Sequence, residues 1–413
     1  MTATMRNLVI LGAGTAGTMM ANRMSQRLSR EEWAVTVVDR DDVHVYQPGL
    51  LFLPFRQYRR EQIVKPRKSL VLDTAELVLD EVDRIDPAAN VVALKSGRRL
   101  PYDILVIATG THIRPEQTPG LTGRLWQKDI FDFYTLDGAS KLAHRLAKFD
   151  GGRFVIDTVE MPIKCPVAPL EMAFLADAHF RDRGIRDKVE MVYVTPLDGA
   201  FTKPRAAAAF GSMLDERDIH VVTNFTANGV DEERRTLTSY DGREEPFDLL
   251  VSIPLHGGSE AIIRSEMGDD FGFVPTDKRT LRSKHFENVF VVGDATDVPT
   301  SKAGSVAHFM GDVLTENLFR YIDERELEPA FDGHANCFIE TGHDKAMLID
   351  FNYETEPLPG KFPLPGIGPF SLLGETEANH WGKLAFKWMY WNVLVKGGEL
   401  PFDHRMLMAG KRS

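Results

Sequence analysis

A glycine-rich turn near the amino terminus constrains the fold of this chain more than any other feature. Gly12, Gly14 and Gly17 follow an apolar strand and open a helical pattern, and the next strand ends at Asp39. Glycines at this spacing let backbone amides approach a pyrophosphate at a helix amino terminus, and the acid binds a ribose hydroxyl. The pattern predicts a βαβ unit that binds a dinucleotide.

The rest of the chain also alternates strands and helices. A chain of 413 residues exceeds the size at which one core keeps growing, so more than one domain is expected. Strand-like runs at 76–79, 91–94 and 104–107 are interpreted as a small antiparallel meander that returns into a parallel sheet. We predict an α/β fold with two Rossmann-like dinucleotide-binding domains and a C-terminal extension with an amphipathic helix. The expected segments are 1–112 and 247–330 for the first domain, 113–246 for the second domain and 331–413 for the C-terminal domain.

Composition excludes several classes of protein. The net charge of -11 provides no basic stripe for a nucleic acid, so no such partner is expected. Cys165 and Cys337 are the only cysteines, which is too few for a disulfide scaffold, and neither has the spacing of a zinc site, so no metal is expected. The amino terminus leads directly into a strand rather than a signal peptide, and no run of 18 apolar residues predicts a spanning helix.

Two further strands indicate which dinucleotide is bound. One ends at Thr109 and Gly110, and another ends at Gly293 and Asp294. Here the chain resembles the flavoprotein disulfide reductases, whose fold is glutathione-reductase-like. The resemblance implies that FAD is bound and that Asp294 contacts its ribitol or phosphate. The residues expected at the cofactor are Gly12, Gly14, Ala16, Gly17, Asp39, Arg40, Thr109, Gly110, Gly293, Asp294 and Lys302.

The second α/β unit lacks the corresponding loop for a nicotinamide cofactor. After the strand at 154–156 the segment carries Pro162, Cys165 and Pro166 and contains no glycine. Because proline has no amide hydrogen to offer a pyrophosphate, NAD(P)H binding is disfavoured. We expect electrons to enter through sulfur instead.

The segments 164–171 and 336–342, each with one cysteine, resemble motifs of the sulfide:quinone oxidoreductases. The resemblance implies that Cys165 and Cys337 flank the flavin and form a disulfide or polysulfur bridge, which sulfide attacks to give polysulfide or sulfane sulfur. Electrons then pass to a membrane quinone. The sequence leaves open which cysteine faces the flavin. A third cysteine of many members is missing from 126–134, so the FAD is expected to be noncovalent.

Several side chains near these motifs have more than one interpretation. Glu171 matches a family acid that relays the sulfide proton, or it complements the dipole of the helix that it begins. The same helix is expected to lower the pKa of the Cys165 thiol. Lys302 and His308 contact the flavin edge or a quinone, or they lie on the solvated surface.

The segment 379–395 predicts a helix at a membrane interface. It contains Trp381, Trp388 and Trp391, with lysines that include Lys383 beside the apolar stripe. Residues 379–413 carry six Lys or Arg against two Asp or Glu, a net of +4 that suits anionic lipid. A core or dimer helix is the alternative. The candidates for the quinone site are Phe338, Trp381, Trp388 and Trp391.

The resulting hypothesis is a peripheral membrane enzyme on the cytoplasmic face that oxidises sulfide and reduces quinone, with homo-oligomerisation left open. Three alternatives remain. They are the flavoprotein of a flavocytochrome c sulfide dehydrogenase, a type II NADH:quinone oxidoreductase, and a flavin-bearing sulfur carrier or redox sensor without turnover.

Overall fold

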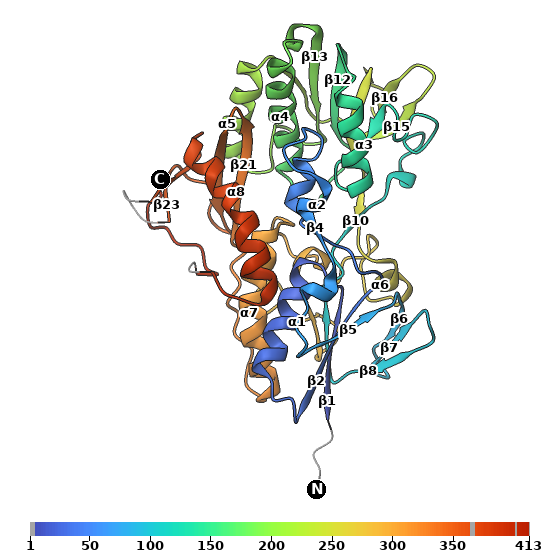
Figure 1. Ribbon diagram of the computed structural model, residues 1–413, viewed down its shortest axis with the longest axis vertical. Coiled ribbons are helices and arrows are strands. Elements are labelled where there is room, and N and C mark those ends of the chain that lie inside the picture. Colours follow the sequence, from blue (N-terminus) through green and yellow to red (C-terminus); the bar gives the residue numbers. More distant parts are fainter. Residues whose placement is uncertain (1–4, 364–367, 401–402, 413) are drawn as a thin grey trace.

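The computed structural model describes residues 5–363, 368–400 and 403–412, and it contains two α/β domains and a C-terminal domain (Figure 1). The first domain is built on a parallel five-stranded sheet. The strand order is β20 (Val289–Val291), β9 (Ile104–Ile107), β1 (Arg6–Leu11), β2 (Trp33–Asp39) and β5 (Glu76–Leu79).

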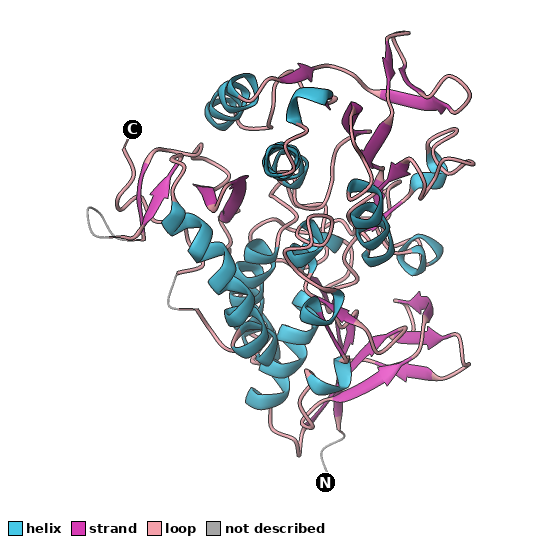
Figure 2. Ribbon diagram, turned by 45° about the horizontal axis from the view of Figure 1, so that its top comes forward, coloured by secondary structure: helices cyan, strands magenta, loops and turns pink. Residues whose placement is uncertain are grey.

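Both faces of this sheet are covered. One face packs against α1 (Thr15–Arg27) and α7 (Gly304–Ile322), with Leu8 and Ile10 in the shared core. The other face, with Val9 and Leu11, packs against a small antiparallel sheet of β6 (Val82–Asp86), β7 (Val91–Leu94) and β8 (Arg99–Pro101). Figure 2 shows the helices on one flank and this small sheet on the other. The continuous burial of β1 is typical of a parallel strand covered on both faces.

The predicted meander is partly wrong. Only 91–94 belongs to the antiparallel sheet. The runs at 76–79 and 104–107 are the parallel strands β5 and β9 of the main sheet. A short apolar run does not reveal which neighbour the strand pairs with, so both runs were assigned to the wrong sheet.

The second domain repeats the architecture. Its sheet is parallel, with the order β11 (Ile130–Phe131), β18 (Leu249–Ile253), β12 (Gly152–Thr158), β13 (Val189–Val194) and β14 (Ile219–Val222). Its helices are α3 (Leu136–Leu146), α4 (Ala168–Asp182) and α5 (Pro204–Glu216). An antiparallel sheet is formed by β15 (Ala227–Asp231), β16 (Thr236–Ser239) and β17 (Glu244–Pro246).

One predicted boundary needs correction. The strand β18 was expected in the first domain because that domain was predicted to resume at 247. It pairs instead with β12 and β11 of the second sheet, so the first domain resumes only after residue 253. A crossing pair, β10 (His112–Ile113) with β19 (His256–Gly257), marks the two linkers between the domains. Shorter elements are β3 (His44–Val45), α2 (Arg60–Ile63), β4 (Val64–Lys65) and α6 (Glu260–Arg264).

The C-terminal domain lies beside both α/β domains (Figure 1). Its sheet has the order β21 (Ala335–Gly342), β22 (Lys345–Phe351), β24 (Phe370–Leu372) and β23 (Gly360–Phe362). Helix α8 (Glu377–Asn392) packs on this sheet, and the short turn of helix that follows it packs on α1. Among the described residues, no helix combines the length and the apolarity that crossing a membrane requires.

Candidate active site

The glycine turn after β1 is shaped by close backbone contacts. Gly12 has φ +93°, and a Cβ there would lie 2.5 Å from the carbonyl oxygen of Ala108. A Cβ at Gly17 would lie 1.7 Å from the carbonyl oxygen of Gly12, so neither position accepts a side chain. A Cβ at Gly14 would meet no atom within 4 Å. The turn is therefore closed on its protein side and open at Gly14, where it fits a pyrophosphate at the amino end of α1.

The three segments predicted at the cofactor meet at the carboxyl edge of the first sheet. Leu11 of β1 and Val291 of β20 both pair with Ile107 of β9, so the turns after these strands lie side by side. A Cβ at Gly293 would lie 3.2 Å from that of Ala16, which places the last of these turns against the glycine turn. Ligands of open parallel sheets bind at this edge.

The turn after β9 presents polar groups that lack protein partners. The hydroxyls of Thr109 and Thr111 are buried, and neither has a hydrogen-bond partner among the described residues. Gly110 between them has φ +66°, and a Cβ there would meet no atom within 4 Å. Because buried polar groups are nearly always satisfied, these orphaned hydroxyls beside an open turn fit a bound polar cofactor.

Asp39 lies at the end of β2, as predicted, beside an arginine that the sequence did not indicate. Its carboxylate accepts a 2.7 Å hydrogen bond from the amide of Ala13 and lies 3.1 Å from the guanidinium of Arg67. Burial raises the pKa of Asp39, and Arg67 opposes the rise. The side chain of Arg40 is exposed and lies 3.5 Å from Asp41. Arg67 is therefore the better placed of the two arginines for a ligand at Asp39.

Lys302 ties the turn after β20 to the loop that carries Cys165. Its ammonium group donates hydrogen bonds to the carbonyls of Asp294 at 2.9 Å and Thr296 at 2.8 Å. Its own carbonyl accepts a 2.7 Å hydrogen bond from the amide of Cys165. Lys302 and His308 are both buried, so the surface alternative is wrong for each. Burial raises the pKa of Asp294, and the charge of Lys302 opposes the rise.

The two cysteines, 172 positions apart in the sequence (337 minus 165), lie within electrostatic reach of each other. Both are free thiols. Cys165 has φ +50°, which is unusual for a residue other than glycine and is typical of strained functional loops. Cys337 lies on β21 next to Asn336, whose carbonyl accepts a 2.7 Å hydrogen bond from the hydroxyl of Ser305.

The electrostatics of these thiols differ from the sequence expectation. Burial raises the pKa of Cys165, and the neighbouring carboxylate of Glu171 raises it further, so the predicted lowering by the helix is wrong. Burial likewise raises the pKa of Cys337 to about 12. The ammonium group of Lys383 opposes both shifts. These thiols therefore stay protonated near neutral pH unless a base or a cation acts on them.

Glu171 and Lys383 form a buried ion pair next to the sulfur atoms. Glu171 lies in the first turn of α4, and its Oε1 contacts Nζ of Lys383. The same oxygen accepts a 2.7 Å hydrogen bond from the amide of Glu340, and Lys383 donates a 3.0 Å hydrogen bond to the carbonyl of Phe338. Burial raises the pKa of Glu171, while Lys383 lowers it. Lys383 was expected on the surface, and this expectation is wrong.

Helix α8 presents two of its three tryptophans to solvent. Trp381 is 63% exposed and Trp388 is 64% exposed, whereas Trp391 is 6% exposed. Trp391 packs 5.0 Å from Tyr390, with Nζ of Lys65 4.6 Å from its ring. The single stripe predicted from the spacing is therefore wrong, because α8 buries the side that carries Trp391 and Lys383.

The aromatic side chains of α8 and β21 also position this helix. The ring of Phe338 packs 5.1 Å from that of Phe370 and faces α8 at Gly382. The hydroxyl of Tyr390 lies 2.8 Å from Oγ1 of Thr15 and 2.6 Å from Nε2 of His44. Since Thr15 begins α1, Tyr390 connects α8 directly to the glycine turn.

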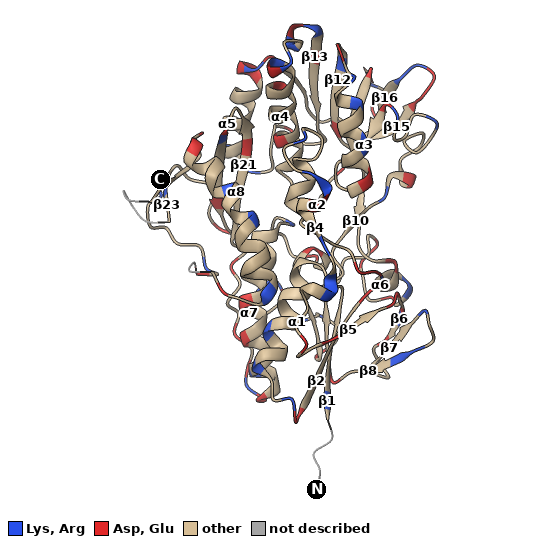
Figure 3. Ribbon diagram, viewed as in Figure 1, with Lys and Arg blue, Asp and Glu red and all other residues tan. Residues whose placement is uncertain are grey.

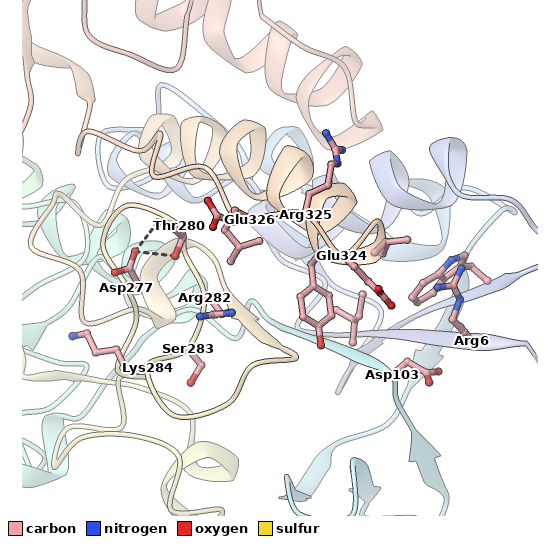
Figure 4. Close-up of a pocket in the computed structure, with 15 residues that line it drawn as sticks. Arg6, Asp103, Asp277, Thr280, Arg282, Ser283, Lys284, Glu324, Arg325 and Glu326 are labelled. Atoms are coloured by element: carbon pink, nitrogen blue, oxygen red, sulfur yellow. Dashed lines mark hydrogen bonds between the residues drawn. The ribbon is translucent and has the colours of Figure 1, made fainter.

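A polar pocket of about 950 Å³ lies elsewhere, at the amino ends of the first sheet (Figure 4). It is lined by Arg6 and Asp103 at the starts of strands and by charged side chains of both signs, such as Arg282 and Glu324. Cofactors of this architecture bind at the opposite edge of the sheet. Charged residues of both signs are also spread over the rest of the molecule (Figure 3), without a basic stripe.

Sequence reasoning missed Arg67, Lys383, Glu340 and Tyr390. Arg67 and Lys383 are charged residues whose sequence neighbourhoods are polar or amphipathic, so nothing in the local pattern predicts burial. No local signal distinguishes Lys383, because Lys383 and Lys387 are four residues apart and therefore lie on the same face of the helix, yet only Lys383 is buried.

Comparisons with known proteins agree with this geometry. Residues 6–311 match the model of the family described as pyridine nucleotide-disulphide oxidoreductase. The mitochondrial sulfide:quinone oxidoreductase of Mus musculus is 27% identical over 94% of this chain and 86% of that protein. The solved sulfide:quinone oxidoreductase of Aquifex aeolicus superposes with a TM-score of 0.79 at 21% identity, over 96% of this chain and 93% of that chain. A type II NADH:quinone oxidoreductase of Staphylococcus aureus is 22% identical over 86% of this chain and 92% of that protein. The resemblance drawn from the cysteine motifs is confirmed.

Proposed function

Because the chain belongs to the pyridine nucleotide-disulphide oxidoreductase family, we propose that this FAD-dependent oxidoreductase oxidises sulfide and passes the electrons to a quinone. The observation behind the proposal is that Cys165 and Cys337 lie within electrostatic reach of each other and of the buried Glu171 and Lys383 pair, in a chain whose second domain has no glycine turn after its first long strand. The sulfur centre takes the place of a nicotinamide as the point where electrons enter.

The sulfur chemistry begins with a bridge between Cys165 and Cys337 in the oxidised enzyme. HS⁻ attacks one sulfur of the disulfide, the S–S bond breaks, and a persulfide and a thiolate result. The ammonium group of Lys383 stabilises that thiolate, since it opposes the rise in the pKa of both cysteines. Loss of two electrons and one proton then leaves sulfane sulfur at the centre, from which it is released as polysulfide.

Glu171 accepts the one proton that HS⁻ brings, which leaves the persulfide as the two electrons are lost. It is 2% exposed, and burial raises its pKa, which makes its carboxylate a stronger base. Lys383 holds the carboxylate in place and favours its ionised form. The persulfide is thus deprotonated where the cysteines react.

The first glycine turn, Thr109 to Thr111 and Gly293 to Asp294 would hold FAD at the edge of the sheet, and Asp39 with Arg67 would bind its ribose. When bound, FAD accepts two electrons from sulfur and delivers them to the quinone. We infer that it is held noncovalently. Neither cysteine is then needed as an attachment point, and both are available for sulfur chemistry.

The quinone is proposed to reach the site beneath α8, next to Phe338 and the segment that carries Cys337. Trp381 and Trp388 lie on the exposed side of α8 and are suited to the headgroup region of a bilayer. Trp391 is withdrawn as a surface contact because it is buried. Attachment to the cytoplasmic face and homo-oligomerisation stay predictions.

The test is to add sulfide to the FAD-loaded protein without oxygen and to record the absorbance of the flavin. We expect rapid bleaching in the wild type, none in Cys165→Ser and Cys337→Ser, and reoxidation on addition of a short-chain ubiquinone. NADH is the matched control donor, and it is expected to bleach the flavin at no more than about 1% of the rate with sulfide. Bleaching by NADH but not by sulfide would establish the type II NADH:quinone oxidoreductase alternative instead.

A further inference from the structure

Ionisable side chains lead from the sulfur site to the surface of the C-terminal domain. Behind the Glu171 and Lys383 pair lies Glu340, which is 1% exposed. The carboxylate of Glu340 forms a 2.9 Å hydrogen bond with Nδ1 of His380, in the first turn of α8. Nε2 of His380 lies 3.6 Å from Asp344, whose side chain is 85% exposed in the turn between β21 and β22. The chain of groups therefore ends in solvent.

The inner and outer halves of this chain are joined at Lys383 and Glu340. The amide of Glu340 donates a hydrogen bond to Glu171, the same carboxylate that contacts Lys383. Burial raises the pKa of Glu340, and the Lys383 charge lowers it, so the two side chains interact directly through their charges. One bridging water molecule would complete the hydrogen-bonded path from Glu171 to the carboxylate of Glu340.

A purely structural role explains this arrangement poorly. Buried ion pairs contribute little net stability, because the desolvation of each charge offsets the attraction. An anchor for α8 would need only one pair, yet five ionisable groups follow one another and the last reaches water. The phenol of Tyr58 also faces Lys383 and Glu340, and its pKa is raised by burial. This phenol stays protonated, so it does not take a proton from the row of ionisable groups.

We propose that the protons released by sulfide leave the sulfur site through a buried outlet to the surface, formed by Glu171, Lys383, Glu340, His380 and Asp344. The inference rests on the proposed function, because it assigns a route to protons that only sulfide oxidation produces.

The outlet balances the chemistry at the cysteines. Oxidation of HS⁻ to sulfane sulfur yields one proton and two electrons, and the electrons leave through the flavin to the quinone. The proton that Glu171 took from sulfide passes to Glu340, while Lys383 keeps its own proton and holds the two carboxylates in place, because these carboxylates outweigh the effect of its burial and raise its pKa. Glu340 passes its proton to His380, and Asp344 hands it to water. Glu171 is then a carboxylate again, ready for the next sulfide.

The test compares His380→Ala with the wild type in anaerobic stopped-flow reduction of the flavin by sulfide. We expect the rate constant to fall by about tenfold or more, since a relay member acts as an acid and base. Added imidazole is expected to restore the rate in a saturable way, because the vacated space opens beside the exposed Asp344. His343→Asn is the matched control, since His343 is 54% exposed in the same turn and lies outside the outlet. It is expected to react as the wild type does, with or without imidazole.

Glu340→Gln keeps the hydrogen bond to His380 but carries no titratable proton. We expect it to slow the same reaction, without rescue by imidazole and with FAD content equal to that of the wild type. It provides the test if His380→Ala fails to fold.

Three results would overturn the outlet: a wild-type rate in His380→Ala, a slow rate that imidazole leaves unchanged, or a wild-type rate in Glu340→Gln. Each of these, in a protein whose wild type responds to sulfide, leaves the proposed function intact. Absence of any response in the FAD-loaded wild type refutes the proposed function and the outlet together.

Discussion

Replacing Lys383 by methionine should lower the free energy of unfolding, because it leaves buried carboxylates near the sulfur site without their cation. Methionine is similar in length and apolar, so it fills the space while removing the cation. Glu171 would then be buried with only the amide of Glu340 as a partner. Glu340 would retain its hydrogen bond to His380 but lose the positive charge of Lys383.

The expected loss follows from the geometry of the pair. Removing one partner of a buried ion pair typically costs about 3–5 kcal/mol, because the remaining charge is left uncompensated. The pKa of Glu171 is already raised by burial, and loss of Lys383 raises it further. A carboxyl group with a raised folded-state pKa binds more protons when folded than when unfolded. Stability therefore falls as pH rises above about 4, and Lys383→Met should be more destabilised at pH 8 than at pH 5.

The assay is urea unfolding of the holoprotein at both pH values, with circular dichroism as the measure of folding. The double variant Lys383→Met with Glu171→Gln should recover all but about 1 kcal/mol of the loss, because the orphaned charge is gone. The matched control is Lys387→Met, since Lys387 lies only over the ring of Tyr58 at 3.8 Å and should cost less than about 1 kcal/mol. Equal stability of Lys383→Met and the wild type, or no recovery in the double variant, would refute the buried pair.

Three further predictions concern other parts of the molecule. Gly14→Ala should fold with a native circular dichroism spectrum yet bind FAD at least about tenfold more weakly. Gly17→Ala should fail to fold, because its Cβ would lie 1.7 Å from a backbone oxygen. The FAD content after gel filtration checks both variants. Asp157 is buried, which raises its pKa to about 8, so the folded protein retains a proton that the unfolded chain releases and stability falls between about pH 4 and pH 8; Asp157→Asn should raise the unfolding free energy by about 4 kcal/mol more at pH 8 than at pH 5. His44, His256 and His308 are buried, which lowers their pKa values to about 4, about 3 and about 3. As pH falls below about 6.5, the unfolded chain therefore takes up protons that the folded protein does not, and stability falls. His256→Gln should reduce the drop in unfolding free energy between pH 7 and pH 5 by about 2 kcal/mol.

Local patterns predicted the parts of the site that depend on backbone geometry. The glycine turn, the strand ending at Thr109 and Gly110, and the Gly293 to Asp294 turn each carry their function in adjacent residues. The rules for parallel sheets then place these segments at one edge. The missing glycines after β12 and the two cysteine contexts were equally local.

The parts that failed depend on packing between distant segments. Burial of Lys383 follows from contact between α8 and α4, which are more than 200 residues apart. The periodicity of α8 contains no information about Glu171 in α4, with which Lys383 pairs. The predicted tryptophan stripe failed for the same reason, since Trp391 packs on the first domain. The strands β5, β9 and β18 were recognised as strands, but their partners follow from the sheet that they join, which short apolar runs leave undetermined.

Mass spectrometry of the oxidised protein shows directly whether Cys165 and Cys337 form one redox centre. After alkylation of free thiols and proteolysis without reductant, we expect a single species in which the Cys165 and Cys337 peptides are joined by two or more sulfur atoms. Reduction should separate the two peptides, and sulfide should add mass in steps of one sulfur. The redox centre would be refuted if both cysteines were fully alkylated in an oxidised protein whose flavin is still bleached by sulfide.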